Sequence, residues 1–132
     1  MYGGVAGTTI NGGNYKFGGQ VLDGSSGSDV LLAGKSATIE ISGPNDTLTG
    51  NLNAADKFVF NDAFGNNEIT NFNPKNDTIW LDHTDITNLK QLMADATQVG
   101  MNAVINDGVG NVIQLDNVKL SALHSSDFHF IV

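Results

Sequence analysis

The chain has 132 residues, of which 40% are apolar, and it has no cysteine and a formal net charge of -8. This length suits one domain, or one domain with an appendage. The absence of cysteine excludes a disulfide framework and thiolate metal sites. The excess of 14 acidic over six basic residues argues against nucleic acid and anionic membranes as partners. No apolar run approaches the roughly 18 residues of a transmembrane segment, so we expect none.

The composition favours turns and short strands over helices. Asparagine and glycine each occur 16 times and aspartate 12 times, whereas arginine is absent and glutamate occurs twice. Asp, Asn and Gly bend the backbone or satisfy its polar groups locally, and the common helix formers Glu and Arg are almost missing. We therefore predict a mainly β protein.

Residues 1–56 consist of short apolar segments separated by small polar breaks. From Leu22 onward their centres lie about nine residues apart, a period typical of stacked coils that bury one face against their neighbours. We predict a short parallel β-roll, a type of β-solenoid, with a largely disordered glycine-rich tail as the alternative. The segments are Thr8–Ile10, Tyr15–Phe17, Gln20–Leu22, Asp29–Leu31, Thr38–Ile41 and Asp46–Leu48.

Residues 57–132 are predicted to continue the roll into a β-rich C-terminal cap with one or two short helices. Apolar and polar residues alternate as in half-buried strands, and a helix carrying Leu89 and Leu92 can be capped by Asp85 or Thr87 and end before Gly100. A second short helix is expected near residues 120–124. The predicted strands are Lys57–Phe60, Asn67–Phe72, Asp77–Leu81, Asn102–Ile105, Asn111–Leu115 and Phe128–Val132. The predicted interior comprises Val30, Leu31, Ile39, Ile41, Leu48, Phe58, Phe60, Ile69, Phe72, Ile79 and Leu81, and we also favour a core position for Trp80.

The strongest local motif runs from Gly24 to Leu32. It fits the nonapeptide Gly-Gly-x-Gly-x-Asp-x-(apolar)-x with one mismatch, at Ser25. In this pattern the glycines allow a tight turn whose carbonyl groups converge, the aspartate adds carboxylate oxygens, and the apolar residue fills the interior. A set of oxygen ligands suits a hard cation such as Ca²⁺, whereas zinc or copper would favour His or Cys.

Two nonapeptides make one turn of such a coil, so loops roughly 18 residues apart should stack on one edge. Asp46 follows Asp29 by 17 residues, whereas Asn11 on the preceding turn has no carboxylate and Lys35 on the opposite edge would repel a cation. The candidate ligands are Asp29 and Asp46, with carbonyl groups near Gly24, Gly27 and Gly43. The alternative is that both aspartates only cap turns.

With these motifs the chain resembles the hemolysin-type calcium-binding (RTX) family, in particular the C-terminal region of type I secreted proteins. The resemblance rests first on the nonapeptide and then on the segment from Asp56 to Leu81, which is similar to the pattern "D-x-F-x-F … I-x-D-F-x-x-x-x-D-x-I-x-L". It rests also on Asn111–Val118 and on the ending Asp127-Phe128-His129-Phe130, which are similar to the closing strands of serralysin-like proteases and alginate-epimerase modules.

The resemblance implies a secreted module of a larger protein from a Gram-negative bacterium. It implies that calcium drives folding outside the cell, and that an upstream catalytic or adhesive domain accompanies the module. It also implies a C-terminal signal read by a type I exporter, formed here by Asp127, Phe128, His129, Phe130, Ile131 and Val132. From the residues alone, the same segment is equally well a final packed strand.

No convincing catalytic set is present. There is no His-Glu-x-x-His, no Gly-x-Ser-x-Gly, no phosphate loop and no cysteine nucleophile. We therefore predict a non-enzymatic module. The alternative function is a carbohydrate-binding or carbohydrate-modifying β-solenoid of the kind associated with alginate-type enzymes, with a polysaccharide as its partner.

Overall fold

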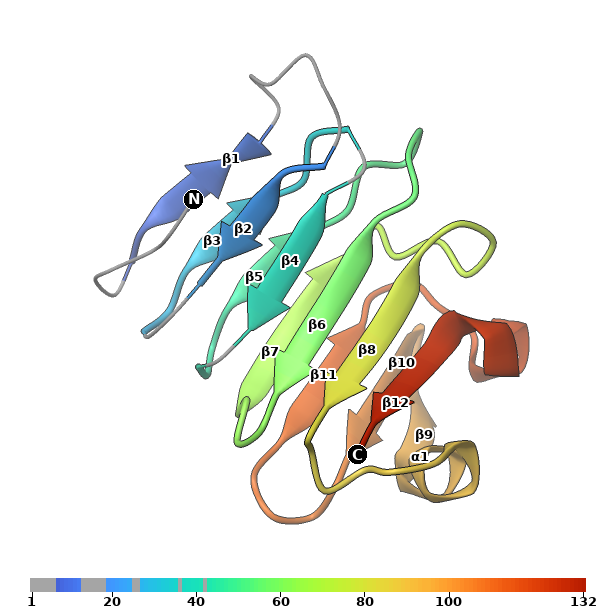
Figure 1. The fold of residues 1–132 in the computed structure, drawn as a ribbon. Helices are drawn as coiled ribbons and strands as arrows, with labels where there is room; N and C mark the ends of the chain where they lie inside the picture. The colour runs from blue at the N-terminus through green and yellow to red at the C-terminus, as the bar shows by residue number, and fades with distance from the viewer. Residues whose placement is uncertain (1–6, 13–18, 25–26, 36, 42) are drawn as a thin grey trace.

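The computed structural model describes residues 7–12, 19–24, 27–35, 37–41 and 43–132, and places their strands in two sheets (Figure 1). One sheet has seven strands in the order β1-β3-β5-β7-β11-β10-β9, and the other has five in the order β12-β8-β6-β4-β2. The strands are β1 (Thr9–Asn11), β2 (Val21–Asp23), β3 (Val30–Leu32), β4 (Thr38–Ile41), β5 (Thr47–Thr49), β6 (Lys57–Asn61), β7 (Asn66–Thr70), β8 (Thr78–Asp82), β9 (Ala96–Val99), β10 (Asn102–Asn106), β11 (Val112–Leu115) and β12 (Phe128–Ile131).

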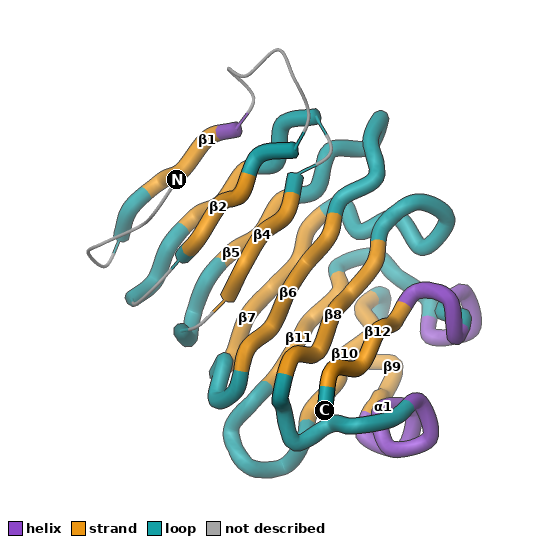
Figure 2. Tube along the Cα trace, viewed as in Figure 1, coloured by secondary structure: helices purple, strands orange, loops and turns teal. Residues whose placement is uncertain are grey.

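Successive strands from β1 to β8 alternate between the two sheets, and within each sheet they pair in parallel. The pairing runs across residue 56, because β4 pairs with β6 and β5 pairs with β7. At the C-terminal end β11 extends one sheet and β12 the other, while β9 and β10 form antiparallel pairs (Figure 2). The prediction of a mainly β protein with parallel sheets is confirmed.

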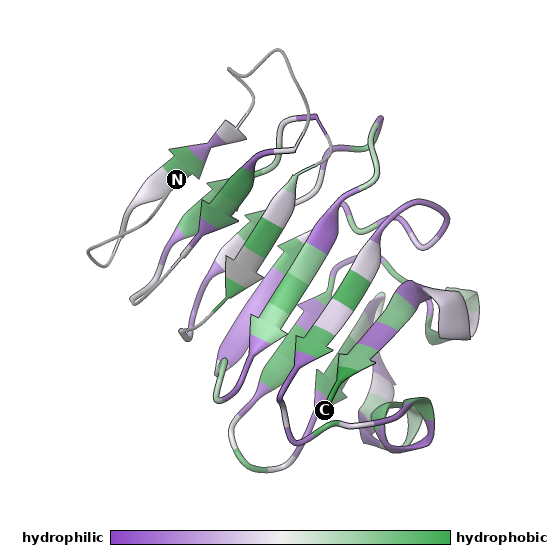
Figure 3. Ribbon diagram, viewed as in Figure 1, coloured by the Kyte–Doolittle hydropathy of each residue, from purple (hydrophilic) through white to green (hydrophobic). Residues whose placement is uncertain are grey.

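The hydrophobic core lies between the two sheets. Each three-residue strand buries its central side chain, as Leu22, Leu31 and Leu48 show with no exposed area, because alternate residues of a strand point to opposite faces. Apolar residues therefore recur strand after strand along both sheets (Figure 3). The later part of the core is richer in aromatic side chains, with Phe58 packed on Phe72 and Phe60 packed on Phe64 at centroid distances of 6.0 and 5.0 Å.

Two predicted core positions prove to be wrong. Val30 lies on the outer face of β3 with 37% of its surface exposed, because the inward position of this short strand belongs to Leu31. Trp80 lies on the outer face of β8 between the buried Ile79 and Leu81. The predicted segment Tyr15–Phe17 lies outside the described residues.

The helix α1 (Leu89–Asp95) is shorter than predicted, and neither Asp85 nor Thr87 is its cap. Asn88 takes the N-cap position with an extended backbone, and its Oδ1 accepts a 2.9 Å hydrogen bond from the Gln91 N–H. The helix ends at Asp95 because the next residues, Ala96–Val99, pair with β10 as an additional strand. Farther on, a 3₁₀ turn at Leu120–Ala122 lies in the region of the second predicted helix, and another follows it at Ser125–Asp127. In the described part of the chain, α1 and the other helical segments are too short and too polar to cross a membrane.

The contrast between Leu31 and Val30 predicts different costs for shortening two neighbouring side chains. Leu31→Ala should lower the free energy of unfolding by about 2–5 kcal/mol, because it removes buried methyl groups and leaves a cavity. Val30→Ala should cost no more than about 1 kcal/mol, since that side chain is on the outer face. Urea unfolding in buffer containing calcium measures both values, and equal losses would contradict the inward and outward assignment.

Candidate cation site

A ladder of side-chain oxygens runs along the starts of β1, β3, β5 and β7. Asp29 Oδ1 accepts a 2.9 Å hydrogen bond from the Thr8 N–H, Asp46 Oδ1 accepts one of 2.8 Å from the Asp29 N–H, and Asn67 Oδ1 accepts one of 2.8 Å from the Asp46 N–H. We call Asp29, Asp46 and Asn67 the first ladder. All three side chains are buried, with at most 2% of their surface exposed. Each therefore links the start of its own strand to the strand before it in the sheet.

A second ladder, formed by Asp56 and Asp77, runs along the starts of β4, β6 and β8. Asp56 Oδ1 accepts a 2.9 Å hydrogen bond from the Ala37 N–H, and Asp77 Oδ1 accepts one of the same length from the Asp56 N–H. Both carboxylates are again buried, at 2% and 1% exposure. The two sheets thus use the same device at the points where their strands begin.

The local sequence explains why the ladders form. Each ladder aspartate stands two residues before an inward apolar side chain, as in Asp29-Val30-Leu31 and Asp77-Thr78-Ile79. Such short strands form few backbone hydrogen bonds to their neighbours in the sheet, and a buried N–H without an acceptor is costly. An aspartate or asparagine at the position before the strand supplies that acceptor.

Two oxygens of the first ladder have no hydrogen-bond partner. Asp29 Oδ2 and Asp46 Oδ2 are both buried and unpaired. In the second ladder every second oxygen is satisfied, because Asp56 Oδ2 accepts from the Asn51 N–H and Asp77 Oδ2 from the Asn73 N–H at 2.6 and 2.8 Å. A buried charged oxygen without a partner is costly to maintain, so these two atoms could accept a bond from a cation or a proton.

Gly24 closes over one of these oxygens. A β-carbon added to Gly24 would come within 2.8 Å of Asp46 Oδ2, so this position requires glycine for the close approach of the backbone. Gly27 has a φ of 101°, which L side chains rarely adopt, and Gly43 is buried. The structure therefore brings Gly24, Asp29 and Asp46 together, while Ser25 and Ser26 of the same motif lie outside the described residues.

Few other side chains that could bind a cation lie near Asp29 and Asp46 among the described residues. The residue that occupies the position of Asp29 on the preceding strand is Thr8, rather than the predicted Asn11. Among the described residues, no three His, Cys, Asp or Glu side chains converge, so side chains alone would give a cation two carboxylates. The ion pairs of described carboxylates involve His83 and His124, and in this part of the chain no lysine lies within ion-pair distance of Asp29 or Asp46.

Burial of the ladders changes their proton affinity. It raises the pKa of Asp46 to about 6, with a further increase from the nearby Asp29 carboxylate, although the hydrogen bond from the Asp29 N–H acts in the opposite direction. The pKa of Asp77 is also raised to about 6, chiefly by burial, and that of Asp56 is raised for the same reason. At neutral pH the metal-free protein therefore carries buried negative charges that oppose folding.

Sequence reasoning missed Asn67 and the second ladder as parts of this network. The Asp-x-apolar pattern at Asp56 and Asp77 is the same as at Asp29 and Asp46, and it could have identified the second ladder. Asn67 follows the related pattern Asn67-Glu68-Ile69, with the buried Ile69 two residues later. Its place beside Asp46 follows from the pairing of Thr47 with Glu68.

The outer face of the five-stranded sheet carries an aromatic cluster formed by Lys57, Trp80 and His129. Lys57 Nζ lies 3.7 Å from the Trp80 ring centroid, and the His129 ring stacks on Trp80 at 4.4 Å with an interplanar angle of 18°. These partners come from β6 and β12, the strands on either side of β8. Trp80 therefore already has ring contacts from both neighbouring strands, and a sugar could stack on it only by displacing one of them.

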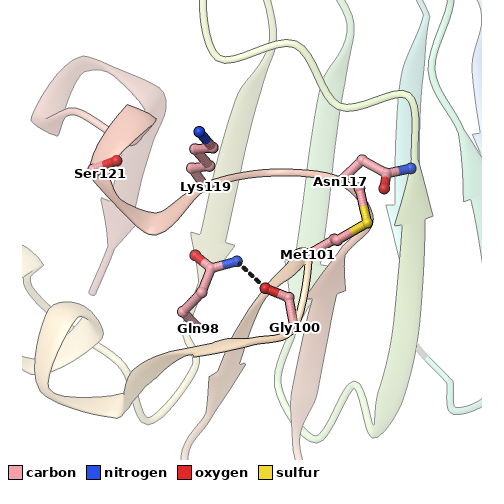
Figure 4. Close-up of a pocket in the computed structure, with 6 residues that line it drawn as sticks. All are labelled: Gln98, Gly100, Met101, Asn117, Lys119 and Ser121. Atoms are coloured by element: carbon pink, nitrogen blue, oxygen red, sulfur yellow. Dashed lines mark hydrogen bonds between the residues drawn. The ribbon is translucent and has the colours of Figure 1, made fainter.

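A second surface feature is a hollow of about 410 Å³ beside the turn between β9 and β10, lined by Gln98, Gly100, Met101, Asn117, Lys119 and Ser121 (Figure 4). Both terminal atoms of the Gln98 side chain form hydrogen bonds to backbone groups around the hollow. The two hydrogens on its Nε2 are shared among the carbonyl oxygens of Gly100, Asn102 and Val118, and its Oε1 accepts from the Leu120 N–H at 2.7 Å. The lining residues include no carboxylate, histidine or cysteine, so the hollow offers no acid, base or metal ligand of those types.

No protein-family model matches the chain, and no curated protein matches it.

The raised pKa values predict how stability depends on pH. An ordinary aspartate has a pKa of 3.8, against about 6 for Asp46 and Asp77 in the folded protein, so the folded state binds protons more tightly than the unfolded chain. The free energy of unfolding of the metal-free protein should therefore rise as the pH falls from 7.5 to 5. Urea unfolding at a series of pH values measures this slope.

A matched pair of variants isolates the contribution of Asp46 to this slope. Asp46→Asn should flatten the pH dependence, because it removes one of the titrating groups, while Asp62→Asn makes the same charge change at an exposed position and should leave the slope unchanged. A metal-free protein that loses stability between pH 7.5 and 5 would contradict the assignment.

Proposed function

We propose that the chain is a non-catalytic calcium-binding module that folds when calcium binds outside the cell. The observation that carries this proposal is the pair of buried, unpartnered oxygens Asp29 Oδ2 and Asp46 Oδ2 on neighbouring strands. A divalent cation would neutralise both carboxylates at once, which a single hydrogen-bond donor cannot do.

The chemistry of the available donors favours calcium over other metals. Asp29 and Asp46 would hold the ion through carboxylate oxygens, and the carbonyl groups near Gly24, Gly27 and Gly43 are the proposed additional donors. Calcium accepts six to eight oxygen ligands in flexible geometry, including carbonyl groups and water. When bound, the ion supplies positive charge that links two successive loops.

The strand arrangement supports the finer proposal of a parallel β-roll. Strands β1 to β8 alternate between two sheets, and each pairs in parallel with the strand two places along the chain. In this interpretation each coil consists of one strand from each sheet, and the ladders join one coil to the next. Loops on one edge of the roll then stack on each other, as a shared calcium site between Asp29 and Asp46 requires.

Charge provides the link between calcium and folding. The chain has a net charge of -8, and burial of Asp46 disfavours its charged form. In a compartment with little free calcium, repulsion and desolvation oppose folding of this part of the chain, whereas millimolar calcium offsets both. This is the behaviour expected of a module of a larger secreted bacterial protein, which we propose for this chain.

Calcium titration of the metal-stripped protein tests the proposal. We expect a calcium-specific gain in the β signal of far-ultraviolet circular dichroism, with magnesium giving little change because it favours a smaller octahedral site. Asp46→Asn should weaken calcium binding by about tenfold or more while preserving the Oδ1 hydrogen bond, since an asparagine already serves that role at residue 67.

Asp62→Asn is the control for this titration, because Asp62 is exposed and lies outside both ladders. Its calcium response should equal that of the unaltered chain. A protein whose fold, stability and heat of mixing are all indifferent to calcium would exclude the proposed function.

We further propose that residues 127–132 carry the signal for a type I exporter. In the folded chain Asp127 and Phe128 are buried at 3% and 5% exposure, and Asp127 Oδ2 accepts a 2.6 Å hydrogen bond from the His124 N–H. The whole of β12, Phe128 included, pairs with β8, and Val132 is 83% exposed. An exporter that reads this segment must therefore engage it before β12 is packed.

Export from cells that contain a type I exporter tests the signal. Removal of residues 127–132 should abolish appearance of the protein in the medium. Undiminished export of the shortened chain would exclude the signal.

A further inference from the structure

The first ladder changes its chemistry after Asp46. Asn67 lies at the same register position as Asp46 on the next strand, and its Oδ1 performs the same task of accepting a backbone N–H. Its other terminal atom differs, because Asn67 Nδ2 donates a 2.8 Å hydrogen bond to the Phe64 carbonyl oxygen. At this position an amide donor therefore occupies the place where Asp29 and Asp46 leave an unpartnered oxygen.

The second ladder is also complete without a cation. The second oxygens of Asp56 and Asp77 accept hydrogen bonds from the N–H groups of Asn51 and Asn73. At Asp56, Asp77 and Asn67 the second terminal atom of the side chain is therefore satisfied within the protein. The unsatisfied oxygens among the described ladder residues are confined to Asp29 and Asp46.

We propose that Asn67 ends the calcium-dependent part of the protein. Its amide takes the place of the cation, so the strands from β6 onward keep their fold without calcium, and the loops that carry Asp29 and Asp46 acquire stable order only with the ion. This inference rests on the proposed calcium-binding function and adds where along the chain calcium acts.

The distribution of the core supports the same division. Strands β2, β3 and β5 each have three residues and bury one large apolar side chain at the centre. Strands β6, β7 and β8 each have five residues, and the aromatic pairs Phe58–Phe72 and Phe60–Phe64 lie in this later part. β6 buries three apolar side chains and β8 two, whereas β7 buries Ile69 alone. The greater apolar burial in β6 and β8 allows the later part to remain folded when the earlier loops carry uncompensated charge.

Hydrogen exchange of the whole chain, in calcium and in EDTA, tests the division directly. Removing calcium should speed exchange by about tenfold or more in peptides covering β3 and β5, because local opening becomes easier there. Exchange in β6, β7, β8 and β11 should change little. Equal loss of protection in both groups of strands would overturn the inference while leaving calcium binding intact.

Substitution of Asn67 tests the role of its amide. Asn67→Asp replaces the Nδ2 donor with an oxygen that faces the Phe64 carbonyl oxygen, so in EDTA the midpoint of thermal unfolding should fall by roughly 5–10 °C. Asn66→Asp is the matched control, because Asn66 is the exposed neighbour on the same strand and receives the same change in charge. Its midpoint should change by less than about 2 °C.

Calcium should then recover part of the stability lost in Asn67→Asp, giving this variant a larger calcium-induced shift than Asn66→Asp. Equal stability of the two variants in EDTA would overturn the proposed role of the amide. Identical exchange of the unaltered chain in calcium and EDTA, in every strand, would instead overturn the proposed function itself.

Discussion

The structure depends on one recurring interaction, in which a buried Asp or Asn Oδ1 accepts the N–H at the start of a neighbouring strand. In the first ladder this bond joins Thr8 to Asp29, Asp29 to Asp46 and Asp46 to Asn67. Strands of three residues bury too little apolar surface and form too few hydrogen bonds to be stable alone. The side-chain oxygen adds one hydrogen bond between neighbouring strands beyond those of the backbone. The strands can therefore stack in a fixed register even where little hydrophobic surface is buried.

The same interaction creates the electrostatic problem that the proposed function would solve. A carboxylate brings two oxygens, and a single strand-starting N–H satisfies one of them. At Asp56 and Asp77 nearby backbone donors satisfy the second, whereas at Asp29 and Asp46 the second oxygen is left buried without a partner. Because the structural bond fixes each carboxylate, the unpartnered oxygens are also held in place, which reduces the entropic cost of binding a cation.

The sequence predicts the repeated strands better than the features that depend on contacts between distant parts of the chain. Apolar residues such as Leu31 and Ile79 are placed correctly because each occupies the inward position of a strand. Ala96–Val99 was missed as a strand, since its residues continue a helical spacing and only pairing with β10 makes them extended. Trp80 was misplaced because its flanking residues are apolar, whereas the contacts that half-cover it come from Lys57 and His129 on other strands. Asn67 was missed because it has no carboxylate, although Asn67-Glu68-Ile69 has the same spacing as Asp46-Thr47-Leu48.

Asparagine and aspartate are interchangeable for the shared structural bond but have opposite consequences for the rest of the site. Either residue can place Oδ1 on the preceding strand, so the fold itself does not distinguish Asp46 from Asn67. The second atom does, because an amide donates to a carbonyl group while a carboxylate oxygen requires a proton or a cation. If calcium binds as proposed, a stack built on this bond can vary its dependence on the ion one strand at a time, without altering strand length, register or core.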